Sequence, residues 1–148
     1  MKEKTFFSYA AADTEVVGSN MALSLYKSGC RRAFIAMRGE MGVGKTAFVR
    51  GFCRPLGIKT VHSPTFNVVN EYRAGKIPVF HFDMYRIESE DDLLSIGYED
   101  YLSKDGYVLC EWSENIADSI PEGAYFVTIT RTDEADGRKI EVISPDNG

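Results

Sequence analysis

The chain has 148 residues, and its composition of 44% apolar and 26% charged residues is that of one soluble globular domain rather than of a disordered chain. The formal net charge of −5 disfavours direct binding to nucleic acid, because affinity for a polyanion comes largely from lysine and arginine. The apolar runs are too short to cross a bilayer and the N-terminus lacks a signal-peptide pattern, so we expect a cytoplasmic protein with no membrane association and one domain over residues 1–148.

The first half of the chain predicts alternating strands and helices. A short strand is expected at residues 5–9, followed by a helix that Asp13 or Thr14 can cap. That helix carries apolar side chains at fourfold spacing, namely Val17, Met21 and Leu25. A buried strand at residues 33–38 leads into a glycine-rich loop, and a helix at residues 46–55 follows the loop.

The second half begins with a candidate β-hairpin formed by residues 66–72 and 77–82, with residues 74–76 as its turn. Ser89 opens an acidic helix that ends before Gly106. We expect this helix to bury three residues, Leu94, Tyr98 and Tyr101.

The last elements predict a strand at residues 107–110 and a C-terminal hairpin. Residues 125–130 alternate apolar and polar side chains, and residues 138–143 pair with them across a turn at Asp136 and Gly137. Together these elements predict a single α/β domain with a mixed parallel and antiparallel sheet flanked by helices. The glycine-rich loop, GEMGVGKT at residues 39–46, adds that the domain is of the P-loop NTPase-like class.

The glycine-rich loop carries the clearest chemical signal. Residues 39–46 read GEMGVGKT, which matches the phosphate-binding pattern G-x-x-x-x-G-K-[ST] and lies between a buried strand and a helix. Backbone N–H groups of such a loop, together with those of the helix start, form a concave anion site. Lys45 should reach the β- and γ-phosphates of a nucleoside triphosphate, and the Thr46 hydroxyl should ligate Mg²⁺.

Two acidic residues follow apolar strands, where a P-loop enzyme needs carboxylates near its metal ion. Asp83 follows the strand at residues 77–82, and Glu111 follows the strand at residues 107–110. Either carboxylate could hold Mg²⁺ directly or through water, and either could orient the attacking water. A solvated surface carboxylate is the alternative for each residue taken alone.

Two further residues are weaker candidates. Thr65 lies in a loop after the P-loop helix and could sense the γ-phosphate, although a proline turn leading into a strand explains its surroundings equally well. Trp112, the single tryptophan, is explained on its own by half-buried packing. The sequence contains neither an N-K-x-D segment for guanine nor a D-x-x-G switch, so ATP is favoured over GTP.

Four motifs in this order closely resemble the bacterial tRNA threonylcarbamoyladenosine biosynthesis ATPase family, TsaE (formerly YjeE). They are GVGKTAFVRGF at residues 42–52, SPTF at 63–66, HFDMYR at 81–86 and EW at 111–112. The resemblance covers nearly the whole chain. It implies an ATPase that supports threonylcarbamoyl modification of adenosine 37 in tRNAs reading codons that start with A.

The resemblance also implies partners and site roles. The family acts on the TsaB–TsaD pair, so tRNA would be engaged only indirectly. ATP and Mg²⁺ are the implied cofactors, Thr65 would lie near the γ-phosphate, Asp83 and Glu111 would serve metal and water, and Trp112 would lie beside the nucleotide. The remaining expected nucleotide contacts are the loop residues Met41, Gly42, Val43 and Gly44, with adenine between Ala11 and Gly137.

Two other functions remain open. A small P-loop metabolite kinase would need arginines on a lid over the phosphates, but residues 87–105 are acidic and contain no arginine. A nucleotide-dependent binding module without essential hydrolysis is harder to separate from a partner-activated ATPase on the residues alone.

Overall fold

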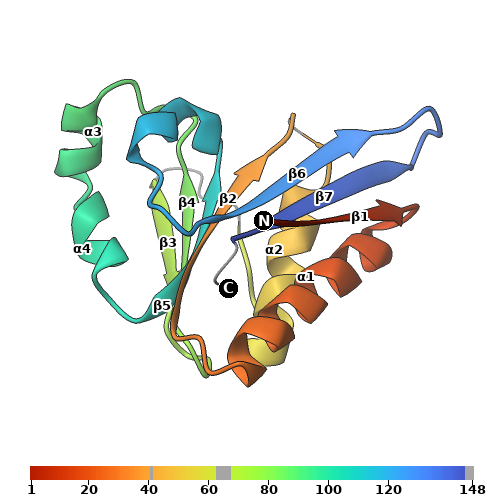
Figure 1. Cartoon of the computed structure of the whole chain (residues 1–148), viewed down its shortest axis with the longest axis horizontal. Coiled ribbons are helices and arrows are strands. Elements are labelled where there is room, and N and C mark those ends of the chain that lie inside the picture. The colour runs from red at the N-terminus through yellow and green to blue at the C-terminus, as the bar shows by residue number, and fades with distance from the viewer. Residues whose placement is uncertain (41, 63–67, 146–148) are drawn as a thin grey trace.

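The computed structural model describes residues 1–40, 42–62 and 68–145, and they form one mixed sheet of seven strands covered by helices on both faces (Figure 1). The strands lie in the order β1-β7-β6-β2-β5-β4-β3. The pairs β2–β5, β2–β6 and β4–β5 are parallel, whereas the outer pairs β1–β7, β6–β7 and β3–β4 are antiparallel. The strands are β1 (Lys2–Ser8), β2 (Arg32–Arg38), β3 (Val69–Tyr72), β4 (Val79–Asp83), β5 (Gly106–Glu111), β6 (Tyr125–Arg131) and β7 (Arg138–Ser144).

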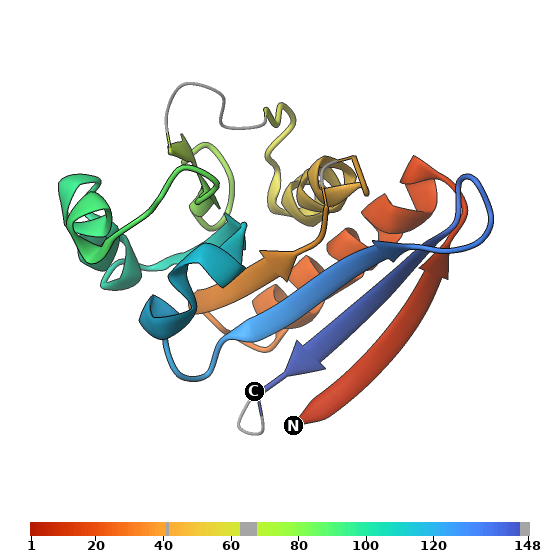
Figure 2. The same ribbon diagram turned by 90° about the horizontal axis from the view of Figure 1, so that it is seen from above.

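One face of the sheet is covered by α1 (Ala11–Lys27) and α2 (Lys45–Cys53), which the 3₁₀ turn η1 (Arg54–Leu56) extends. The two helices lie side by side (Figure 2). Their close approach requires a glycine on α2, because a Cβ atom at Gly51 would lie 2.1 Å from the carbonyl oxygen of Glu15. The Ser19 hydroxyl donates to the Gly51 carbonyl oxygen at 2.7 Å and ties the helices together.

The opposite face packs against α3 (Glu90–Ser95), α4 (Tyr98–Leu102) and the 3₁₀ segment η2 (Ser113–Ser119). Aromatic rings fill this second core, with Tyr98 edge-on to Phe34 and to Phe82. The acidic helices therefore lie across the sheet from α2.

The alternation of side chains along β4 and β5 places three polar residues on the face of the sheet that α2 covers. Phe80 and Phe82 enter the core under α3 and α4, so His81 and Asp83 project to the face covered by α2. On β5, Leu109 belongs to the α2-side core, and Glu111, two residues further on, projects the same way.

The fold class is confirmed, and most predicted elements are present with shifted ends. The first strand begins at Lys2, three residues before the predicted start. The first helix begins at Ala11 with Ala10 as its N-cap, so Asp13 and Thr14 lie inside its first turn and the capping prediction is wrong. The Asp13 side chain instead accepts a hydrogen bond from the backbone N–H of Tyr9, just before the helix, at 3.0 Å.

The acidic helix differs most from its prediction. Ser89 does cap it, accepting from the Asp92 N–H at 3.3 Å, but the helix ends at Ser95 and a second one starts after Gly97. Gly97 has φ of 71°, a left-handed conformation that interrupts the helix. The break turns Leu94 outward, where it is 71% exposed, and Leu93 is buried instead.

The strand predicted at residues 66–72 is described only from Val69 onward, and its predicted start lies outside the described residues. Within the part of the chain that is described, no helix has the length and apolar character needed to cross a membrane.

Candidate nucleotide-binding site

The glycine loop joins the carboxyl end of β2 to the first turn of α2. Gly39 has φ of 147°, and a Cβ atom there would lie 2.6 Å from the carbonyl oxygen of Ile129 on β6. Gly44, the N-cap of α2, has φ of 109° in the left-handed region. These two positions require glycine, and they turn the chain so that the first N–H groups of α2 face the concave side of the loop.

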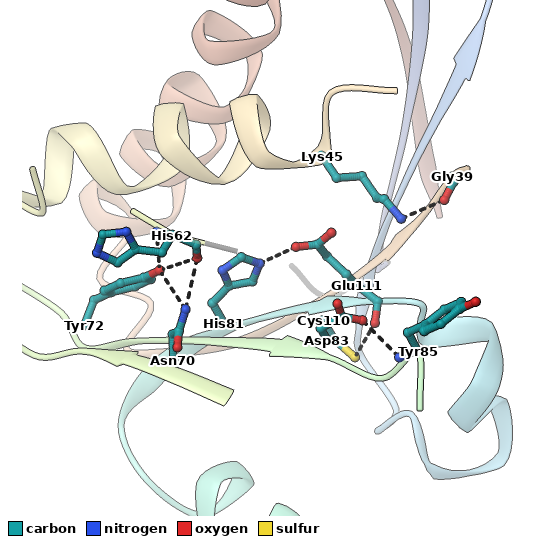
Figure 3. Close-up of polar contacts among 10 residues, drawn as sticks. All are labelled: Gly39, Lys45, His62, Asn70, Tyr72, His81, Asp83, Tyr85, Cys110 and Glu111. Atoms are coloured by element: carbon teal, nitrogen blue, oxygen red, sulfur yellow. Dashed lines mark hydrogen bonds and ion pairs between the residues drawn. The ribbon is translucent and has the colours of Figure 1, made fainter. Parts of the chain in front are cut away.

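Lys45, the first residue of α2, is 6% exposed although it is charged. Its Nζ atom donates to the Gly39 carbonyl oxygen at 2.7 Å (Figure 3). The same atom lies 4.7 Å from the centre of the Trp112 ring. The ammonium group is thus held over the mouth of the loop by a carbonyl dipole and an aromatic face. An anion placed there would meet a cation already largely stripped of water.

The two strand-end carboxylates meet at the same edge. Asp83 and Glu111 are direct partners in the parallel β4–β5 register, and both project to the α2 face (Figure 3). Glu111 is only 7% exposed. Burial raises the pKa of Asp83 above its usual range, the hydrogen bond from the Tyr85 N–H opposes this, and the negative charge of Glu111 adds to the rise.

This pair fits a magnesium ion that is shared with a ligand. Among the described residues, no group of three or more His, Cys, Asp or Glu side chains is arranged to hold a metal ion. Mg²⁺ is commonly bound by one or two carboxylates together with substrate phosphates and water. Asp83, Glu111 and the half-buried Thr46 could therefore hold it only with phosphate oxygens completing the shell.

Glu111 is also in contact with His81, which the sequence reasoning did not single out. The ring Nε2 of His81 meets the Glu111 Oε2 atom, and the histidine is fully buried (Figure 3). The signal in the sequence is the spacing of His81 and Asp83, which puts both side chains on one face of β4.

Trp112 lies beside the phosphate-binding lysine and is fixed by its backbone and by a neighbouring ring. Its φ of 57° is the one positive value among the described non-glycine residues. Tyr85 packs edge-on against it with ring centres 5.0 Å apart.

A hollow of about 380 Å³ adjoins the other side of the glycine loop, a size suited to a small molecule. Figure 2 shows the β6–β7 turn beside the start of α1, where this hollow lies. It is lined from three directions, by Tyr9 and Ala11, by Gly42 and Val43, and by Asp136 and Arg138.

Arg138 connects the hairpin to the glycine loop, and the sequence reasoning did not identify it. Its Nε atom donates to the Val43 carbonyl oxygen at 3.0 Å. Gly137, expected near the adenine, lies between the two hairpin residues that line the hollow. The structure thus brings Ala11, the loop and the hairpin turn together. Two other expected site residues, Met41 and Thr65, lie outside the described residues.

Known proteins resemble this chain in sequence and in fold. Residues 9–140 match the family model "Threonylcarbamoyl adenosine biosynthesis protein TsaE". A protein of that name from Bacillus subtilis is 36% identical over 72% of this chain and 66% of its own length. One from Haemophilus influenzae is 37% identical over 88% of this chain and 82% of its own length. The crystal structure of Bacillus subtilis YdiB superposes with a TM-score of 0.81 at 25% identity, covering 99% of this chain and 88% of that one.

Proposed function

The chain belongs to the TsaE family of threonylcarbamoyl adenosine biosynthesis proteins, and from this premise we propose that it is the ATP-hydrolysing subunit required for threonylcarbamoyladenosine modification of tRNA. One observation carries the hydrolytic part of the proposal. Lys45 and the aligned pair Asp83 and Glu111 converge at one edge of the sheet, next to a loop built for phosphates.

In this proposal different residues bind the phosphates, hold the metal ion and activate the water. The glycine loop and Lys45 bind the phosphates, while Thr46 and Asp83 hold the metal ion, with Glu111 available to share it. Mg²⁺, when bound, neutralises charge on the β- and γ-phosphate oxygens. Glu111 orients the attacking water and accepts its proton, and Thr65 contacts the γ-phosphate.

The hollow beside the glycine loop supports a place for the base in this proposal. Adenine lies between Ala11 and the hairpin turn at Gly137, where the hollow opens. The loop residues Met41, Gly42, Val43 and Gly44 contact the phosphates. Trp112 packs at the phosphate end beside Lys45. We favour ATP over GTP because the chain lacks the sequence segment that reads guanine.

The proposed partners are the TsaB and TsaD proteins in the cytoplasm, with tRNA engaged only through them. The net charge of −5 supports this, since an acidic chain is a poor direct ligand for RNA. We further propose that residues 1–148 act as one domain, weakly active alone and activated by the partners.

The two alternatives differ from this proposal in observable ways. A metabolite kinase needs a lid that closes over the phosphates, but the candidate lid segment α3–α4 lies on the face of the sheet opposite α2. A binding module without essential hydrolysis would support tRNA modification even when Glu111 is replaced by alanine.

The test is ATP hydrolysis by this chain alone and with purified TsaB–TsaD, using Lys45→Ala as the blank. We expect strong stimulation by the partners and none in the variant. Absence of both stimulation and binding to the pair would overturn the role in tRNA modification and leave a nucleotide-binding protein of another kind.

A further inference from the structure

His81 is a buried polar residue to which the proposed function gives no task. It is 0% exposed and lies on β4 between Val79, which belongs to the core under α2, and Asp83. Burying an imidazole costs free energy that an apolar side chain at the same place would not incur. Packing alone therefore gives no reason for a histidine here.

The contacts of the ring point toward Glu111. His81 pairs with Leu109 in the β4–β5 register, so Glu111 is its diagonal neighbour one step nearer the carboxyl edge. The ring Nε2 reaches the Glu111 Oε2 atom, and the Tyr72 ring lies on the β3 side with its centre 6.4 Å away. The other nitrogen, Nδ1, is buried without a hydrogen-bond partner among the described residues.

An ionised Glu111 sets the direction of the hydrogen bond. Its carboxylate oxygens are only acceptors, so the imidazole donates from Nε2. A neutral ring with its proton on Nε2 leaves only a lone pair at Nδ1, which costs less than an orphaned N–H group. The histidine is thus oriented as a donor to one oxygen of the carboxylate.

A glutamate side chain has several rotatable bonds, and holding it in one direction costs conformational entropy. A buried donor on a central strand removes most of that freedom before the ligand arrives. The second oxygen of Glu111 is then presented to the edge where Lys45 and Asp83 meet (Figure 3).

We propose that His81 is a positioning residue that holds the Glu111 carboxylate in its working orientation for ATP hydrolysis. The inference rests on the proposed function, because it assigns His81 a part in the reaction of the same site. It concerns the rate of the chemical step, since His81 lies behind Glu111 and does not line the glycine loop.

The discriminating experiment compares two amide substitutions. The side-chain nitrogen of glutamine reaches the place of Nε2, whereas that of asparagine corresponds to Nδ1 and cannot reach Glu111. With TsaB–TsaD present, we expect His81→Asn to lower kcat about 10- to 100-fold with KM for ATP changed less than about twofold. The kcat of His81→Gln should lie within about threefold of that of the unsubstituted protein.

A double-mutant cycle identifies the residue through which His81 acts. On a Glu111→Gln background, His81→Asn should lower kcat by less than about twofold further. Thermal unfolding and calorimetric ATP binding show whether each variant is folded. His81→Leu, which fills the space without a donor, replaces His81→Asn if the latter does not fold.

The outcomes separate the two proposals. Equal kcat for the asparagine and glutamine variants, or additive losses in the cycle, would overturn the role of His81 while ATP hydrolysis by the unsubstituted protein still supports the proposed function. An unsubstituted protein without partner-stimulated hydrolysis would overturn both.

Discussion

The two ends of the candidate site are built in different ways. At the phosphate end, Lys45 and Glu111 are 6% and 7% exposed and stand at or beside the carboxyl ends of the central parallel strands. At the proposed base end, the hollow is lined partly by exposed residues, among them Tyr9, which is 53% exposed, and Asp136 in the β6–β7 turn.

This contrast shows which part of the site holds its side chains in fixed positions. Central strands are held on both sides by hydrogen bonds and by two cores, so side chains at their ends have little freedom. The proposed base site is instead built from a turn and a helix start, outside the central strands. We therefore expect changes at the phosphate end to affect binding of phosphate and the chemical step, and changes at the base end to affect KM alone.

The largest effect on binding is expected from Lys45→Met, which keeps the length of the side chain and removes its charge. Losing a buried cation that faces the phosphates should weaken ATP binding about 100-fold, equivalent to about 2.7 kcal/mol. Calorimetry with Mg²⁺ present measures this. The matched control is Lys59→Met, at an exposed lysine beyond α2, which should leave affinity unchanged.

A change at the base end should have a smaller and different effect. Ala11→Trp places a bulky ring in the hollow and should raise KM for ATP about tenfold with kcat within about twofold. Inhibition by tripolyphosphate, which has no base, should be unchanged.

The control for this substitution is Ala12→Trp, one residue along α1 and exposed. It should leave KM unchanged. A loss of tripolyphosphate inhibition in Ala11→Trp would contradict the separation of the two ends.

The smallest predicted effect is on thermal stability and concerns Asp83 at the phosphate end. A carboxyl whose pKa is raised by folding binds its proton more tightly when folded, so its stabilising contribution is complete below the ordinary aspartate pKa of about 3.9 and is lost as pH rises through the raised value. Asp83→Asn, which does not titrate, should therefore raise Tm at pH 7 by up to about 2 °C.

The gain from Asp83→Asn should vanish as the pH falls toward about 4. Thermal unfolding without nucleotide across this pH range measures it. Asp133→Asn, at an exposed residue of the β6–β7 turn, makes the same charge change and should show no such trend. A lower Tm at pH 7 for Asp83→Asn would show that the carboxylate stabilises the fold.

The contrast between the ends also explains what could be predicted from the sequence. The glycine loop is a local motif, and the carboxylates at Asp83 and Glu111 follow visibly apolar strands. The contact of His81 with Glu111 could not be predicted in the same way, because it requires knowing that β4 and β5 are neighbours.

The failures in predicting the fold have a related cause. The break at Gly97 and the exposure of Leu94 depend on which face the second core occupies, which the spacing of apolar residues leaves ambiguous between Leu93 and Leu94. The role of Arg138 depends on a hairpin folding back onto the glycine loop, 95 residues away in sequence. Such contacts arise only from the tertiary fold.

The most direct test of the central claim is the turnover of ATP by Glu111→Gln at saturating ATP and Mg²⁺, with TsaB–TsaD present. Glutamine keeps the shape of the side chain but cannot accept the proton of the attacking water. We predict kcat at least about 100-fold below that of the unsubstituted protein, with ATP affinity within about threefold. Unchanged turnover would contradict the assignment of the chemistry to this edge of the sheet.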